Sequence, residues 1–225
     1  MRRSVNLEEI TDGKLYTAND MVKVDCHDCQ GCSVCCRGMG DSIVLDPYDM
    51  WQLTSHLKTG FGGLFEKYIG LHVEDGLILP NLKQDGEEEK CAFLNDEGRC
   101  DIHTFRPGIC RLFPLGRIYD ESGFHYIHQI YECPQKDKTK VKIKKWLGIS
   151  DLKKYEQYIN DWHDFIVVCR DALEELTDEE GRVLAMYLLK SFYQADYVDS
   201  YEAEDFYEDF YKRLERAKEI LGLSD

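Results

Sequence analysis

Residues 26–36 have the sequence Cys26-His27-Asp28-Cys29-Gln30-Gly31-Cys32-Ser33-Val34-Cys35-Cys36. A gap of two residues between cysteines repeats from Cys26 through to Cys35. Two-residue gaps let thiolates on one tight loop converge on a single metal centre, so Cys-x-x-Cys occurs in zinc sites and in iron–sulfur loops alike. The run therefore predicts a loop-rich fold organised around metal.

A second group of cysteines follows at wider spacing, and its members are Cys91, Cys100, Cys110 and Cys133. Chance is a poor explanation for two such groups in one chain. Neighbouring side chains diverge, so Cys35 and Cys36 are not expected to bind one ion as a Cys-x-x-Cys pair does. One of them serves a second centre or turns into the core, and one centre with spare thiols and two centres both stay open.

The type of metal is the next question, because zinc and iron–sulfur clusters both use four thiolate ligands. The spacing Cys29-x-x-Cys32-x-x-Cys35 repeats the three-cysteine run of bacterial ferredoxins, and Cys133-Pro134 repeats their Cys-Pro dipeptide. Ferredoxins place the fourth cysteine close to the run, whereas Cys133 lies far along the chain. The residues favour an iron–sulfur cluster of the 4Fe-4S type and keep Zn²⁺ as the alternative.

Length, charge and hydropathy narrow the class of protein. A chain of 225 residues buries enough surface to fold without disulfides. No apolar stretch of signal-peptide length follows Met1-Arg2-Arg3, and no window reaches the roughly 18 apolar residues of a membrane span. We therefore expect a soluble, cytoplasmic protein without membrane contact. The net charge of −15 argues against a nucleic-acid partner, because phosphate contacts need clustered cations.

The joint pattern of cysteines resembles the CxxCxxCC, or YkgJ-like, family of cysteine-cluster proteins, described as zinc- or iron-chelating. The motif that names the family is present at residues 29–36. The second half of its signature is similar to Cys91-Ala92-Phe93-Leu94, Gly98-Arg99-Cys100-Asp101-Ile102-His103 and Arg106-Pro107-Gly108-Ile109-Cys110-Arg111-Leu112-Phe113-Pro114. The resemblance covers roughly residues 26–134. It implies a metal centre on eight positions: Cys29, Cys32, Cys35, Cys36, Cys91, Cys100, Cys110 and Cys133.

Other residues near this signature need separate assignments. Cys26 lies outside the eight positions and stays open as an additional or alternative ligand. His103 stands where the family commonly has an aromatic residue, so we do not count it as a ligand. Cys169 follows helical apolar spacing and is expected to be a small core residue.

Arginines close to the expected ligands are candidates for cofactor binding. Arg106 and Arg111, with Arg37 and Arg117 as further candidates, are placed in the sequence where guanidinium groups can offset the negative charge of a polythiolate centre. The alternative is that these arginines pair with Asp96 or Asp101 and order the loop.

Charge and cysteine content divide the chain near Ser150. Residues 151–225 carry 9 basic and 20 acidic side chains, and only Cys169 among the ten cysteines lies there. We expect three segments: residues 1–25 at the surface, residues 26–149 as a metal-binding cysteine domain, and residues 150–225 as an acidic helical segment. Residues 136–145 contain six lysines, which predict a solvated strand or linker, with a patch for an acidic partner as the alternative.

The expected fold class is α+β. Apolar spacing predicts helices from Ser150 to Leu173, after the capping box of residues 177–180, and from Ser200 to Leu221 with Gly222 at the end. Asp46-Pro47 predicts an N-cap and the start of a helix. Short strands are expected at 43–45 and 76–79 and in a hairpin of 115–119 with 124–130. The three-helix segment is expected to pack on a loop-rich, metal-binding domain.

Three functions from different classes are open. The first is an iron–sulfur protein that transfers electrons or senses oxidation and binds a protein partner through its acidic helical segment. The second is a structural zinc protein with an interaction role. The third is a protein-modifying enzyme, because the family also resembles the flagellin lysine N-methylase FliB over its cysteine region. No catalytic trio is recognisable, and Gly60-Phe61-Gly62-Gly63 is expected to be a connecting loop rather than a methyl-donor site.

Overall fold

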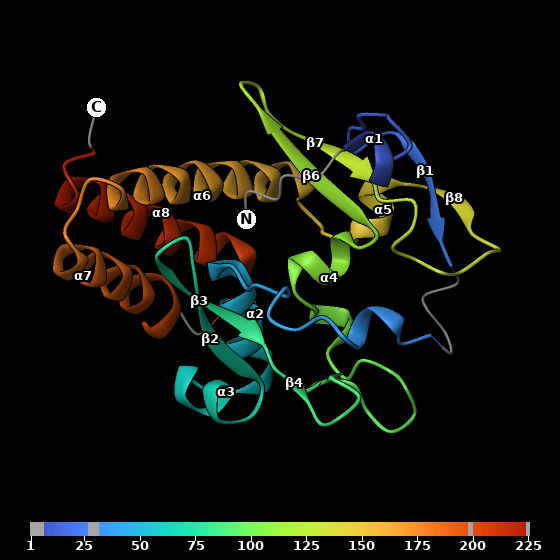
Figure 1. Cartoon of the computed structure of the whole chain (residues 1–225), viewed down its shortest axis with the longest axis horizontal. Coiled ribbons are helices and arrows are strands. Elements are labelled where there is room, and N and C mark those ends of the chain that lie inside the picture. Colours follow the sequence, from blue (N-terminus) through green and yellow to red (C-terminus); the bar gives the residue numbers. More distant parts are fainter. Residues whose placement is uncertain (1–6, 27–31, 198–199, 224–225) are drawn as a thin grey trace.

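Helices and short antiparallel strands make up the fold, which confirms the α+β expectation. The structure, a computed structural model, describes residues 7–26, 32–197 and 200–223. Helices α6, α7 and α8 lie at one end of the molecule, and the strand pair β1 and β8 lies at the other (Figure 1). The strands form two-stranded antiparallel sheets in the described part of the chain.

Helix α2 (Pro47–Leu57) begins as the sequence predicts. Asp46 is the N-cap, Pro47 takes the first helical position, and Asp46 and Asp49 form a reciprocal capping box. The Asp46 side chain accepts from the Asp49 N–H, and the Asp49 side chain accepts from the Asp46 N–H. Two N–H groups that a helix start leaves without partners are thereby satisfied.

Strands β2 (Ile69–Glu74) and β3 (Leu77–Leu82) form a hairpin beside α2. Its two-residue turn uses Asp75 and Gly76, both at positive φ, as a type I′ turn requires. The predicted strand at 76–79 is confirmed within β3. The predicted strand at 43–45 is wrong, because only an isolated bridge joins Val44 to Asn81. The expected loop around Gly60–Gly63 is also wrong, since these residues open helix α3 (Phe61–Lys67).

The segment that carries most of the cysteines consists of short elements. These are η1 (Val34–Cys36), β4 (Gln84–Asp85), β5 (Lys90–Cys91), η2 (His103–Phe105) and α4 (Gly108–Leu112). The predicted hairpin follows as β6 (Leu115–Asp120) and β7 (Gly123–His128) and is confirmed. With so little regular structure, this part of the chain depends on side-chain and loop contacts for its shape.

Strand β1 (Met21–Asp25) pairs with β8 (Thr139–Lys142), which leads into α5 (Ile143–Leu147). Val22 and Val24 on β1 are 2% and 0% exposed, so part of residues 1–25 belongs to the packed core. Helix α1 (Leu7–Ile10) precedes this strand. The division of the chain at residues 25 and 149 stays a prediction.

Three long helical elements follow: α6 (Leu152–Leu173), α7 (Asp178–Leu188) and α8 (Ala203–Ile220). The capping box at Thr177 is confirmed, whereas α6 is capped by Asp151 rather than Ser150, and α8 begins three residues after Ser200. A π-helical turn, η3 (Leu189–Gln194), extends α7. None of the helices in the described ranges is long and apolar enough to cross a bilayer.

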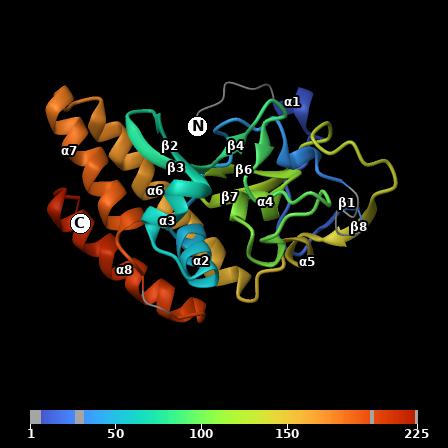
Figure 2. The same cartoon turned by 90° about the horizontal axis from the view of Figure 1, so that it is seen from below.

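Aromatic side chains join these helices to α2. Tyr48 and Tyr158 contact Phe206, whose ring is 0% exposed. The indole N–H of Trp51 donates to the carbonyl of Ser200 at 3.0 Å. Burying each large aromatic ring contributes on the order of 2–3 kcal/mol. The C-terminal helices and α2 therefore share one core, and α2 is held firmly next to the cysteine-bearing elements (Figure 2).

Candidate metal centre

Five cysteines from separate parts of the chain meet around α4. Cys35 and Cys36 lie on η1, Cys91 ends β5, Cys100 follows a tight loop, and Cys110 lies on α4. All five line one cavity of about 900 Å³, which Cys32 lines as well. We call these five the enclosed thiol group.

Backbone contacts bring η1 and β5 together. An isolated antiparallel bridge joins Arg37 to Lys90, and the N–H of Gly38 donates to the carbonyl of Glu89 at 3.0 Å. Gly38 has a φ of +66°, which an L-residue rarely adopts. The end of the Cys35-Cys36 turn is thereby fixed next to Cys91.

The loop of residues 95–99 positions Cys100. Its Asn95 side-chain oxygen accepts from the N–H groups of Glu97 and Arg99, at 3.1 and 2.9 Å. An isolated bridge then pairs Leu94 with Cys100. Asparagine favours such turns because its side chain mimics a backbone acceptor. The turn brings Cys100 back beside the strand that carries Cys91.

Helix α4 carries Cys110, and α2 holds its first turn. The N–H of Gly108 donates to Asp49 Oδ1 at 2.7 Å. Gly108 is needed here because a Cβ would lie 2.2 Å from the Tyr155 hydroxyl. Asp49 is 3% exposed, and a buried carboxyl group is tolerated when it is hydrogen-bonded. Asp49 thus positions the turn that bears Cys110, and the sequence shows it only as the third residue of a capping box.

The enclosed thiols influence one another electrostatically. Burial raises the pKa of Cys91 and Cys100, and it raises the pKa of Cys110 well above the usual value. The negative charge of Cys91 disfavours ionisation of Cys110 as well. Cys35 differs, because a hydrogen bond from the Cys36 thiol, with a contribution from the Arg106 charge, lowers its pKa to about 7. The same hydrogen bond raises the pKa of Cys36.

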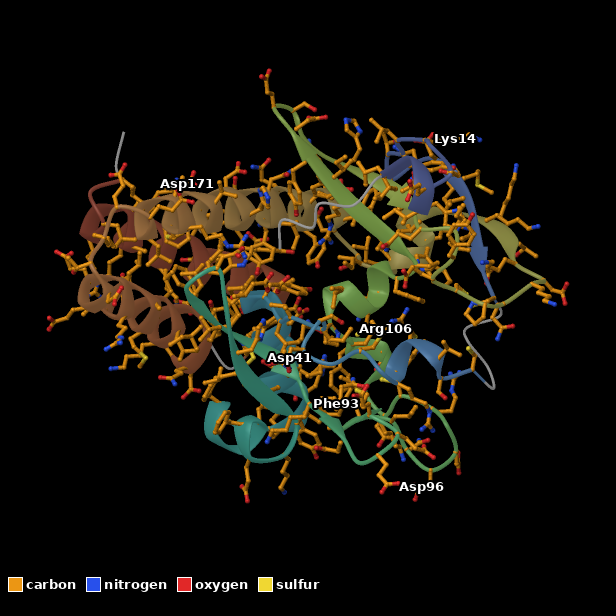
Figure 3. The ribbon with its side chains drawn as sticks, in the orientation of Figure 1. Lys14, Asp41, Phe93, Asp96, Arg106 and Asp171 are labelled. Carbon is orange, nitrogen blue, oxygen red and sulfur yellow. The ribbon has the colours of Figure 1, made fainter. Side chains whose placement is uncertain are left out.

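Arg106 is the arginine whose charge acts on thiols of the enclosed group. Its positive charge lowers the pKa of Cys35 and offsets part of the increase at Cys100. Its Nη1 contacts His103 Nε2 at 2.8 Å and donates to the His103 carbonyl at 2.9 Å. Figure 3 shows Arg106 beside α4, near Phe93. The guanidinium is therefore held by η2 at the edge of the enclosed thiol group.

The other arginines have different partners. Arg111 donates to the carbonyls of Thr104, Arg106 and Leu147, so it fastens η2 and α5 to α4. Arg37 pairs with Glu88. The guanidinium of Arg117 lies over the rings of Phe124 and Tyr155. The expected alternative, pairing of these four arginines with Asp96 or Asp101, is not observed in the described part of the chain, where Lys90 binds Asp96 and Asn95 binds Asp101. A direct role for Arg106 and Arg111 toward a cofactor stays a prediction.

The remaining cysteines form a second group, of which Cys32 also lines the cavity of the enclosed thiol group, and a core position. The charges of Cys26 and Cys32 both raise the pKa of Cys133, after the larger effect of burial. Cys32, Cys133 and Cys26 are called the outer thiol group. Cys29 lies outside the described residues. Cys169 is 0% exposed within the core, as predicted.

The donor set fits a thiolate-bound metal centre, because soft sulfur ligands from several segments surround one cavity. Within the described residues, no three His, Cys, Asp or Glu side chains stand close enough together to hold one ion. A model of a CxxCxxCC domain, whose description is "Putative zinc- or iron-chelating domain", matches residues 28–146. The chain belongs to the CxxCxxCC family. No curated protein and no solved structure matches it significantly.

Membership of the CxxCxxCC family supports metal binding by the cysteine region. The matched residues 28–146 contain all eight predicted ligands and end before α6. Cys26 lies before the matched range, although the structure places it with Cys32 and Cys133. The assignment of individual cysteines as ligands stays a prediction.

Proposed function

We propose that this CxxCxxCC protein holds an iron–sulfur cluster on thiolates of the enclosed group and serves electron transfer or redox sensing in the cytoplasm. The carrying observation is that the five thiols of the enclosed group, together with Cys32, line one cavity beside the fixed guanidinium of Arg106. A structural zinc ion takes four ligands and closes its site. A 4Fe-4S cluster also takes four thiolates, but thiols that line one cavity of about 900 Å³, with no three close enough among the described residues to hold one ion, suit a larger inorganic centre better.

The protein's own residues would act on such a centre in three ways. Burial reduces the contact of the Cys91, Cys100 and Cys110 side chains with water. Arg106 offsets negative charge, and both charge and solvent exposure set the potential of a cluster. Asp49 and Arg111 fix α4 through the contacts described above. A bound cluster would supply reversible one-electron transfer.

A structural zinc ion is the second candidate, and the shortness of the local elements favours it. Strands β4 and β5 have two residues each and α4 has five. Metal ligation supplies folding free energy to regions with so little regular structure. In this case the acidic helical segment would act in protein interaction.

A protein-modifying enzyme similar to a FliB-like lysine N-methylase is the third candidate. The cavity extends from the thiols to Arg117 and Tyr119, which leaves room for a small substrate. Binding of a methyl donor that raises thermal stability would support this candidate.

The deciding experiment is elemental analysis for iron and zinc, with acid-labile sulfide, on protein purified without oxygen. About four irons and four sulfides per chain, as a cubane cluster requires, together with a reversible redox signal, are expected. Stoichiometric zinc without sulfide would overturn the iron–sulfur proposal and select the structural zinc protein.

A further inference from the structure

The two-stranded sheet of β1 and β8 presents lysines on its outer face. Val22 and Val24 point inward and are buried, so alternation places Lys23 outward with Met21. On β8, Lys140 and Lys142 are exposed on the same face. Lys144 and Lys145 on α5, and Lys136 before the strand, are exposed as well. This surface, from Lys23 and residues 136–145, is called the basic sheet.

The register of the sheet concentrates the charge. Lys23 lies directly opposite Lys140, and Lys142 lies opposite Met21, two residues along. Like charges facing each other across a strand pair destabilise the pair. Folding by itself gains nothing from this arrangement, so it points to a binding role.

Within the described residues, the lysines of the basic sheet form no ion pair, unlike Lys90, Lys154 and Lys212 on other elements. The chain as a whole has a net charge of −15. Both views place the basic sheet at the end of the molecule opposite the acidic helices α7 and α8 (Figures 1 and 2). The surface is therefore a local exception to the charge of the protein.

The basic sheet also borders the outer thiol group. Asp25 pairs with Thr139 at the end of the sheet, and Cys26 follows immediately. Lys138 Nζ donates to the Cys133 carbonyl at 3.1 Å. Cationic surface and metal-binding cysteines are thus continuous.

We propose that the basic sheet is the docking surface for an acidic protein that exchanges one electron with the metal centre. This inference rests on the proposed function. Complementary charge steers such encounters and sets their rate and orientation. The electron passes between the cluster and the acidic one-electron carrier, and no bond forms or breaks. A long polyanion such as nucleic acid is disfavoured, because the remaining surface would repel it.

The docking surface is tested first without reference to the cluster. A fluorescein-labelled peptide of ten glutamates is titrated with the full-length protein, and binding is followed by fluorescence anisotropy. The variant K23Q/K140Q/K142Q is compared with the control K67Q/K153Q/K190Q, whose lysines are exposed on other elements. Loss of three surface ion pairs is expected to weaken binding about tenfold, whereas the control changes it less than about twofold. Equal binding by both variants would overturn the docking surface.

Two further arms separate other occupants. A single-stranded oligonucleotide of equal charge that binds more tightly than the peptide would replace the protein partner with nucleic acid. Sedimentation velocity that shows a dimer in the wild type and the control, but not in K23Q/K140Q/K142Q, would replace it with a second copy of the chain. Circular dichroism confirms that each variant is folded.

The electron-transfer part of the proposal is tested with the metal-loaded protein. Oxidation of reduced protein by ferricyanide, an anion, is expected to slow at least about threefold in K23Q/K140Q/K142Q, while oxidation by the hexaammineruthenium(III) cation does not slow. The salt dependence of the ferricyanide rate should decrease in parallel. If the variant binds the peptide more weakly but is oxidised by ferricyanide at the wild-type rate, the docking surface stands and its role in electron transfer is overturned. If the purified protein binds the peptide but contains no iron, only the proposed cluster is overturned and the docking surface stands.

Discussion

Asp49 Oδ1 accepts a hydrogen bond of 2.7 Å from the N–H of Gly108, across 59 residues of sequence. Asp49 belongs to the first turn of α2, and Gly108 opens α4, two residues before Cys110. Helix α2 is anchored in the aromatic core through Tyr48 and Trp51. This hydrogen bond therefore fixes the turn that bears Cys110, a member of the enclosed thiol group, relative to the aromatic core.

Asp49→Ala should destabilise the protein by about 2–3 kcal/mol, because it leaves the buried Gly108 N–H without an acceptor and removes half of a capping box. Urea unfolding measures the loss. Metal content per folded chain should fall as well, since α4 loses its anchor. Asp137→Ala, on an exposed loop, is the control and should change neither quantity.

Stability should depend on pH through the same carboxyl group. Burial and the neighbouring charge of Asp46 raise the pKa of Asp49 well above its usual value. The folded state therefore holds a proton that the unfolded state releases above about pH 4. Wild-type stability relative to Asp49→Asn should fall as pH rises from 4 through the raised pKa. Urea midpoints of both proteins at several pH values test this, and a constant difference would contradict it.

Gly108→Ala should destabilise the protein by about 1–3 kcal/mol, because its Cβ would lie 2.2 Å from the Tyr155 hydroxyl. Tyr155→Phe removes that oxygen, which is buried and has no hydrogen-bond partner of normal geometry in the described part of the chain. The double variant should recover at least half of the loss. A double-mutant cycle by thermal unfolding provides the measurement, and strictly additive effects would refute the clash.

Cys110 and Cys169 should behave differently when changed to serine. Cys110→Ser is expected to lower metal content by more than half and stability with it. Cys169→Ser places a hydroxyl in the core and should cost about 1–3 kcal/mol while metal content per folded chain stays constant. Elemental analysis of both variants decides the matter, and equal metal loss would remove the distinction between ligand and core thiols.

Metal uptake by the metal-free protein should release protons. Ligand thiols must deprotonate, and the pKa values of Cys91, Cys100 and Cys110 are raised by burial. Cys35, with a pKa of about 7, is partly ionised before metal arrives and contributes less. Apparent affinity should therefore fall as pH is lowered from 8 to 6, as a Co²⁺ titration followed by thiolate-to-metal absorption would show. A pH-independent affinity would contradict thiolate ligation by these residues.

The helices could be located from sequence where local chemistry sets their ends. Thr177 with Glu180, and Asp46 with Pro47, are capping signals that operate within one turn, so the predicted starts agree with the structure. Ser150 and Ser200 were less informative, because Asp151 competes as a cap and the chain before α8 is fixed by the distant Trp51. The strand predicted at 43–45 is only a bridge at Val44 for a similar reason. The length of a strand depends on the strand with which it pairs, and that strand lies elsewhere in the sequence.

The sequence by itself determined the metal-binding family, because the two-residue cysteine gaps and the run from Arg106 to Pro114 around Cys110 are local patterns. It also determined the acidic helical segment, through apolar periodicity and composition. Only the tertiary structure decided how the thiols divide: Cys35 and Cys36 meet Cys91, Cys100 and Cys110, while Cys32 lines their cavity and also influences, with Cys26, the pKa of Cys133. That partition depends on long-range contacts, such as Asp49 with Gly108 and Arg37 with Lys90, whose energies come from burial and hydrogen bonding between segments far apart in the chain.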